Sequence, residues 1–122
     1  YLQKRPEWKD IQPGRWDTAV GGHVDYGETI AEALRREVRE EVGVTDFEPQ
    51  HVLTYLFESE RERELVYVYK TVYDGPVVPS GELDGGRFWT LREIAEGVGG
   101  GIFTPNFEGE IRRVAELPDV GR

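Results

Sequence analysis

The segment from Thr29 to Gly43 constrains the fold most, because it predicts one amphipathic helix whose two ends are both marked. Four apolar residues recur at every fourth position and form a single stripe: Ile30, Leu34, Val38 and Val42. Thr29 and Glu32 have the spacing of a capping box at the helix start. Gly43 suits the left-handed position that ends a helix. We therefore predict a helix from about Thr29 to Val42, with one face packed against a sheet.

Three glutamates of this predicted helix share one face beside the apolar stripe. Glu37, Glu40 and Glu41 stand at positions i, i+3 and i+4. Carboxylates gathered where a helix meets a sheet repel one another unless a cation joins them. Hard oxygen ligands in a partly hydrated cluster suit Mg²⁺ or Mn²⁺. The alternative is a solvated acidic face with ion pairs inside the helix, for which three arginines are available: Arg35, Arg36 and Arg39.

The residues on and around this helix resemble the signature of the Nudix family. The signature has the form G-x5-E-x7-R-E-U-x-E-E-x-G-U, in which U is a bulky apolar residue. The chain matches every position without a gap, with Gly22, Glu28, Arg36, Glu37, Val38, Glu40, Glu41, Gly43 and Val44. The resemblance implies a Nudix-type α/β/α sandwich with a mixed β-sheet and a loop–helix–loop metal site. We expect residues 1–122 to form a single domain of this kind.

The resemblance also implies roles for individual residues. The metal ligands would be the carbonyl of Gly21 and the catalytic carboxylates Glu37, Glu40 and Glu41. Arg36 would orient these glutamates and Glu28 would brace the loop, with Gly22 and Gly43 supporting the site. The general base is either a signature glutamate or a later acid. Glu82, ahead of Trp89, matches the position of that later acid, and a plain loop glutamate is the alternative.

The chemistry implied is attack by water on phosphorus in a diphosphate linkage, assisted by Mg²⁺ or Mn²⁺. The substrate would be a nucleoside di- or triphosphate, or a related compound linked to a nucleoside diphosphate. Arg5 and Lys9 are candidates for phosphate contact, and surface solvation is the alternative for both. Glu64, in the pair Glu62-x-Glu64, is a further candidate for substrate contact, with a charged hairpin tip as the alternative.

Residues outside the signature resemble the branch of the family that contains isopentenyl-diphosphate isomerase. The matching residues are Gln3-Lys4-Arg5, Lys9, Pro13-Gly14-Arg15-Trp16 and Gly22-His23. That enzyme needs a cysteine directly before the Gly-His pair, where this chain has Gly21. Glycine supplies neither an acid nor a base for allylic proton transfer. We therefore interpret the chain as a hydrolase of this branch, with the isomerase and a non-catalytic nucleotide-sensing module as the alternatives.

The remaining segments predict several strands and two more helices. We expect strands at 16–20, 51–58, 64–73 and 87–89, with the second and third joined as a hairpin. The helices are expected from Thr90 to about Glu96 and from Phe107 to Leu117. Because the chain opens at Tyr1 with residues typical of the end of a strand, we expect a segment to precede it. The mixture of strands and helices suggests a sheet covered on both faces.

Charge and composition narrow the expected partners. The net charge is −9, whereas a protein that binds nucleic-acid backbones normally presents a basic face. No apolar run approaches the length of a membrane span, so we expect no membrane partner. The chain has no cysteine, which excludes a thiolate nucleophile and is compatible with the cytoplasm. We expect a small-molecule diphosphate as the partner, no nucleic acid, and a homodimer as one option.

Overall fold

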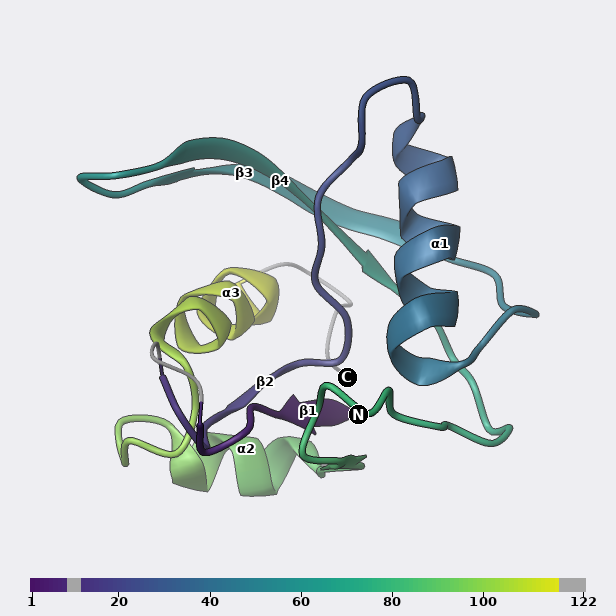
Figure 1. Ribbon diagram of the computed structural model, residues 1–122. Coiled ribbons are helices and arrows are strands. Elements are labelled where there is room, and N and C mark those ends of the chain that lie inside the picture. Colours follow the sequence, from purple (N-terminus) through teal and green to yellow (C-terminus); the bar gives the residue numbers. More distant parts are fainter. Residues whose placement is uncertain (9–11, 117–122) are drawn as a thin grey trace.

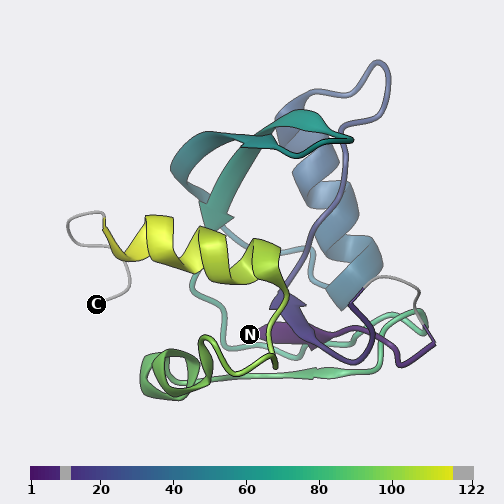
Figure 2. The same ribbon diagram turned by 90° about the vertical axis from the view of Figure 1, so that its left-hand side faces the viewer.

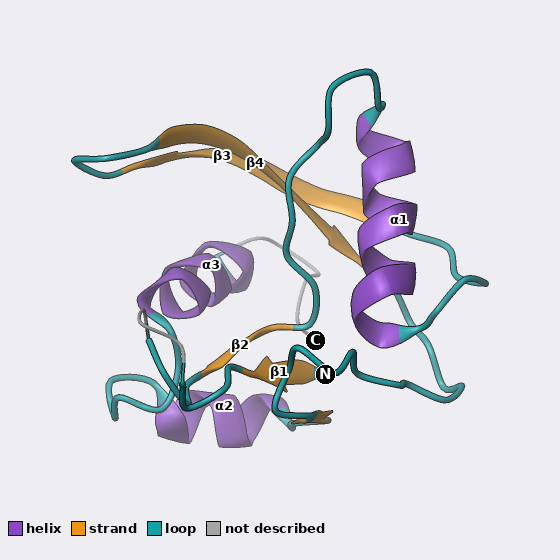
Figure 3. Cartoon of the chain, in the orientation of Figure 1, coloured by secondary structure: helices purple, strands orange, loops and turns teal. Residues whose placement is uncertain are grey.

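The computed structural model describes residues 1–8 and 12–116, and these residues form two β-sheets and three helices (Figures 1 and 3). The first sheet is antiparallel, in the order β2-β1-β5, with β1 at Leu2–Lys4, β2 at Trp16–Thr18 and β5 at Gly86–Arg87. The second is the hairpin of β3 (Gln50–Glu58) and β4 (Arg63–Lys70). The helices are α1 (Ile30–Val42), α2 (Leu91–Gly97) and α3 (Pro105–Ala115).

The three-stranded sheet lies between α2 on one side and α3 on the other (Figures 1 and 2). A buried cluster of Leu2, Phe103 and Phe107 joins these layers, with Ile94 of α2 packed against it. The hairpin of β3 and β4 arches over α3 in both views. Trp16 also forms an isolated parallel bridge with Phe103, so parallel and antiparallel pairing both occur. Helices therefore cover both faces of this sheet, as predicted, although the strands divide into two sheets.

Both ends of α1 lie where the sequence predicts them. Thr29 accepts a hydrogen bond from the backbone of Glu32, and the Glu32 side chain accepts one from the backbone of Thr29. Gly43 adopts φ 69°, a left-handed conformation, and its N–H donates to the carbonyl of Arg39. The apolar stripe ends at Val42, which is buried in a second core cluster with Val44 and Phe47. These contacts anchor the C-terminal turn of α1, which carries the acidic face.

Several predicted boundaries need correction, because local pairing ends or begins elsewhere. Strand β2 ends at Thr18 rather than at residue 20, because its pairing with β1 covers only the residues from Trp16 to Thr18. Strand β4 stops at Lys70 rather than residue 73, and the Thr71 hydroxyl donates to the Glu48 carbonyl instead. Strand β5 covers residues 86–87 rather than 87–89.

The last helix also begins earlier than predicted. It starts at Pro105 rather than Phe107, because Thr104 caps it by accepting a hydrogen bond from the Phe107 N–H. Proline suits the first turn of a helix, where its missing N–H is not needed. The predicted end at Leu117 lies outside the described residues. Within residues 1–8 and 12–116, none of the helices is long and apolar enough to cross a membrane.

Candidate active site

Arg36 connects the loop before α1 to the acidic face of that helix. Its Nε and Nη2 donate to the two carboxylate oxygens of Glu28, at 2.7 and 2.9 Å. Its Nη1 donates to Glu37 Oε1 at 2.7 Å and to Glu40 Oε2 at 3.3 Å, and its Nη2 also donates to the His23 carbonyl. The guanidinium lowers the pKa of Glu28 to about 2 and has its own pKa raised by these acids. One arginine thereby orients three glutamates of the signature.

Glu41 differs from Glu28, Glu37 and Glu40 because it makes no ion pair with a cation among the described residues. Gln3 Nε2 donates to Glu41 Oε1 at 3.3 Å, while Glu41 Oε2 is buried and has no hydrogen-bond partner. Burial, followed by the close carboxyl of Glu37, raises the pKa of Glu41 to about 7. The hydrogen bond from Gln3 opposes that rise in pKa. A buried carboxylate oxygen without a partner is costly, so this position favours a proton or a cation.

Gly21 and Gly22 lie in the loop before α1, and the space around the two residues differs. A Cβ atom on Gly22 would overlap the carboxylate of Glu37. A Cβ atom on Gly21 would meet no heavy atom within 4 Å. Glycine is therefore needed at 22 for the backbone to approach the helix. At Gly21 there is room for a side chain, so packing does not explain the absence of one.

A cavity of about 300 Å³ opens beside Glu41. It is lined by Gln3, Arg5, Pro6, Asp17, Thr18, Gly21, Glu41, Glu82 and Leu83. Four residues selected from the sequence therefore meet on one wall although they are far apart along the chain: Arg5, Gly21, Glu41 and Glu82. With Asp17, the lining includes three acidic residues and one arginine, which form a polar site that suits a charged ligand.

Backbone hydrogen bonds hold the loop that carries Glu82 against this cavity. The Ser80 N–H donates to the carbonyl of Glu41 at 2.9 Å, which ties the start of the loop to the end of α1. The Asp84 N–H donates to the carbonyl of Lys4 at 3.0 Å, which ties its end to β1. Glu82 itself is exposed between these two ties. Its carboxylate makes no ion pair with any of the described residues.

Other residues selected from the sequence lie away from the cavity. Glu40 is exposed and directed to Arg36. Glu64 of β4 lies 3.3 Å from His23 Nε2 and does not line the cavity. Lys9 is outside the described residues. Sequence reasoning assigned no role to three polar residues of the cavity wall: Gln3, Asp17 and Thr18. Gln3 and Asp17 are partners in the register of β1 and β2, which a short polar stretch does not reveal.

The donor set around Glu41 fits a hard divalent cation. Over residues 1–8 and 12–116, no group of three His, Asp or Glu side chains is arranged as a complete set of metal ligands. The reason is that Glu37 and Glu40 both make ion pairs with Arg36. Glu40 has a side chain that is 53% exposed, so it is free to turn. With the unpartnered Glu41 Oε2 beside Glu37, the available oxygens match the preference of Mg²⁺ and Mn²⁺.

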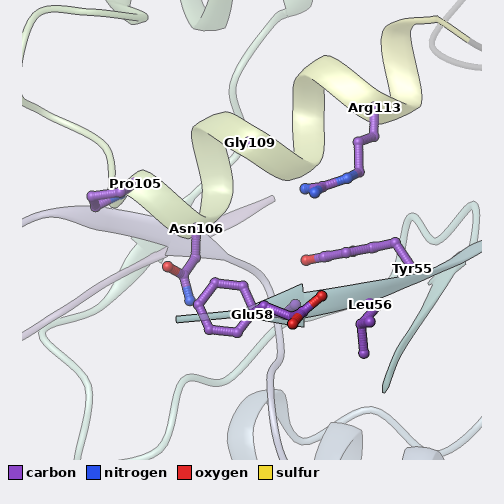
Figure 4. A pocket seen from close by; sticks show the side chains of 8 residues that line it. Tyr55, Leu56, Glu58, Pro105, Asn106, Gly109 and Arg113 are labelled. Carbon is purple, nitrogen blue, oxygen red and sulfur yellow. The ribbon is translucent and has the colours of Figure 1, made fainter. Parts of the chain in front are cut away.

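A second cavity, of about 360 Å³, lies between β3 and α3 (Figure 4). Its lining includes Tyr55, whose ring lies 4.1 Å from the guanidinium carbon of Arg113, and Asn106 at the start of α3. A hydrogen bond, in which Thr104 Oγ1 donates to Asp17 Oδ1 at 3.1 Å, joins the residue before α3 to β2. Asp17 lines the first cavity, and the two residues after Thr104 line the second.

Comparison with known proteins identifies the family. The model of the Nudix domain matches residues 1–107. The chain belongs to the Nudix family. An uncharacterised Nudix hydrolase of Pseudomonas aeruginosa is 33% identical over 88 residues, which covers 71% of this chain and 52% of that protein. The nucleoside triphosphatase NudI of Escherichia coli is 36% identical over 78 residues, covering 57% of this chain and 55% of that protein. The chain thus spans about half the length of these curated relatives.

Solved structures agree with the predicted fold class. The crystal structure of DR0079 from Deinococcus radiodurans superposes with a TM-score of 0.76 at 26% identity, over 92% of this chain and 72% of that one. The MutT protein of Methanosarcina mazei gives a TM-score of 0.68 at 24% identity, over 95% and 84% of the two chains, and shows the fold alone. The Nudix α/β/α sandwich predicted from the sequence is confirmed. The isomerase-like branch stays a prediction.

Proposed function

We propose that this Nudix chain is a hydrolase that cleaves a nucleoside di- or triphosphate, or a related nucleoside diphosphate-linked compound, with Mg²⁺ or Mn²⁺. The observation that carries the proposal is the buried, unpartnered Glu41 Oε2 beside Glu37, on a cavity that also holds Arg5 and Glu82. NudI, a relative of similar sequence, is named as a nucleoside triphosphatase. A cluster of carboxylates alone would repel a diphosphate, so the proposal needs a cation between them.

The acids of α1 would hold that cation together with the carbonyl of Gly21. Glu41 would provide its buried Oε2 and Glu37 the carboxylate beside it, and Glu40 would join them by leaving Arg36. Arg36 keeps Glu37 turned toward the site through their 2.7 Å hydrogen bond. When bound, a divalent cation supplies positive charge that offsets the diphosphate oxygens and makes attack by water easier.

The residues of the cavity wall then serve the reaction itself. The guanidinium of Arg5 suits contact with a phosphate group of the substrate. We assign the general base to Glu82, because this residue lines the cavity and makes no ion pair with Arg36. Water attacks phosphorus, Glu82 takes the proton, and the bond from phosphorus to the bridging oxygen breaks. The products are a nucleoside monophosphate and phosphate, pyrophosphate or the phosphorylated second group.

The test is hydrolysis of a panel of nucleoside di- and triphosphates and of non-nucleoside diphosphates by the purified protein. We expect Mg²⁺- or Mn²⁺-dependent release of phosphate or pyrophosphate, with a nucleoside monophosphate as the other product. Glu41→Gln should lower kcat by several orders of magnitude, and Glu82→Gln should lower it at unchanged metal affinity. Binding of nucleotides without turnover of any of them would contradict the proposal and support the nucleotide-sensing alternative.

The isomerase alternative makes a different prediction. Gly21 leaves open space where that enzyme has its cysteine, and no thiol exists elsewhere in the chain. We therefore expect no isomerisation of isopentenyl diphosphate under conditions in which the protein hydrolyses its substrate. Formation of the allylic isomer would overturn the assignment as a hydrolase.

A further inference from the structure

The side chain of Gln3 joins three segments at the wall of the acidic cavity. Gln3 is the middle residue of β1 and is 8% exposed. Its Nε2 donates to Glu41 Oε1 of α1 at 3.3 Å and to the carbonyl of Ala19, after β2, at 3.4 Å. A carboxamide nitrogen carries two hydrogens, so both donors are used. The amide is therefore fixed from two sides, with one donor committed to a glutamate of the signature.

We propose that Gln3 is a positioning residue that presents Glu41 Oε2 to the divalent cation, an inference that rests on the function proposed above. Its N–H holds Oε1, which leaves Oε2 as the buried oxygen without a hydrogen-bond partner. The amide donates without bringing a positive charge, whereas Arg36 neutralises Glu37 and Glu40. Gln3 thus orients Glu41 without pairing its carboxylate with a positive charge.

The backbone of Gln3 is held independently of its side chain, which allows the two roles to be separated. Its strand pairs with β2, where Gln3 is opposite Asp17, and with β5, where it is opposite Gly86. Removal of the amide donors should therefore leave the sheet in place. The bond to Ala19 also fixes the chain just before Gly21, whose carbonyl is a proposed ligand. Loss of the amide would accordingly loosen two proposed ligands at once.

The experiment compares Gln3→Met, which keeps the side-chain length and removes both donors, with Gln50→Met as a matched control. Gln50 is exposed at the start of β3 and does not line the cavity. Binding of Mn²⁺ is measured from the electron paramagnetic resonance signal of the free ion, and hydrolysis is measured as a function of metal concentration. We expect Gln3→Met to raise the Kd for Mn²⁺ by about ten-fold. Its kcat should recover to within about three-fold of wild type at saturating metal, while Gln50→Met stays unchanged in both.

The outcomes separate this inference from the proposed function. Wild-type protein that neither binds Mn²⁺ nor hydrolyses a diphosphate would defeat the proposed function. Wild-type protein that does both, with an unchanged Kd in Gln3→Met, would defeat the role of Gln3 alone. A purely structural role would lower the melting temperature without moving that Kd.

A second measurement uses the wild-type protein, so it does not depend on the folding of a variant. Addition of Mg²⁺ should shift the side-chain N–H₂ resonances of Gln3 in a nitrogen-15 spectrum and leave those of Gln50 in place. Gln3 resonances that stay still while the backbone signals of Glu41 move would overturn the proposal.

Discussion

Glu37 and Glu41 occupy neighbouring positions on one helix face, but the residues around them stabilise their negative charges to different extents. Glu37 makes a 2.7 Å ion pair with Arg36 and has a side chain that is 20% exposed. Glu41 accepts a hydrogen bond from the uncharged amide of Gln3, and its second oxygen is buried without a partner. One acid is therefore stabilised as an anion by the protein, and the other is left for a proton or an added cation.

This difference predicts a pH dependence of stability in the absence of metal. The pKa of Glu41 is raised from 4.5 to about 7 in the folded protein. Between these pH values the folded state holds a proton that the unfolded chain has released, so the free energy of unfolding falls as pH rises. Glu41→Gln removes this contribution. Melting temperatures in EDTA at pH 5 and pH 8 should therefore drop more for the wild type than for Glu41→Gln, and parallel pH profiles would contradict the assignment.

At the scale of the element, the loop before α1 packs closely against the side chains of that helix. Its approach depends on Gly22, since a Cβ there would overlap Glu37. The same loop is tied to α1 by the hydrogen bonds from Arg36 to Glu28 and to the His23 carbonyl. Displacement of the loop would consequently disturb both the Arg36 network and the Glu37 carboxylate.

The glycine pair provides a matched comparison of two substitutions. Gly22→Ala should push Glu37 away, weaken Mn²⁺ binding and lower the rate of hydrolysis by at least ten-fold, a loss of about 1.4 kcal/mol or more. Gly21→Ala keeps the same carbonyl and adds a methyl group into open space, so its effect should be small. Metal titrations and initial rates on the two variants test this. Equal losses in both would show that the Glu37 contact is not the reason for glycine at 22.

At the scale of the whole molecule, the acidic cavity is lined by residues that lie far apart along the described chain. Gln3 and Arg5 come from the β1 region, Glu41 comes from α1, and Glu82 comes from the loop before β5. An ion held by such a site binds the folded chain and not the unfolded one. Its binding free energy is then added to the stability of the fold as a whole.

We therefore expect Mg²⁺ or Mn²⁺ to raise the stability of the entire protein. At a free concentration of about 100 times Kd, the free energy of unfolding should increase by about 2.7 kcal/mol. Urea denaturation with the ion, compared with NaCl at equal ionic strength, separates binding from screening. Glu41→Gln should gain much less from the ion. A gain of the same size in wild type and variant would indicate that the ion stabilises the protein from elsewhere.

The sequence predicts α1 closely, because the information there is local. Thr29, Glu32 and Gly43 mark the ends through neighbours within four residues, and the apolar period defines the buried face. Glu82, which lines the same cavity as Glu41, is a candidate general base in the sequence only through the resemblance to the family. The contact between Gln3 and Glu41 spans 38 residues and depends on how β1 lies against α1, which periodicity cannot show.

The same reason explains the errors in the strands. Where β2, β4 and β5 end depends on how long each partner strand is, and the pairing of β1 with β5 joins residues more than 80 positions apart. Propensity indicates that such segments are extended, but it does not specify their partners. The division into two sheets follows from these long-range pairings and was therefore missed.

The ties that hold the loop of Glu82 have a consequence for how such a protein changes over evolutionary time. Both ties join backbone groups, from Ser80 to Glu41 and from Asp84 to Lys4, so neither depends on the side chain at position 82. A mutation there changes which group faces the cavity and leaves the frame that presents it intact. Selection can thus exchange the side chain at position 82 for another reactive group at little cost in stability. The acids of α1 are less replaceable, because their side chains make the contacts that hold the site together.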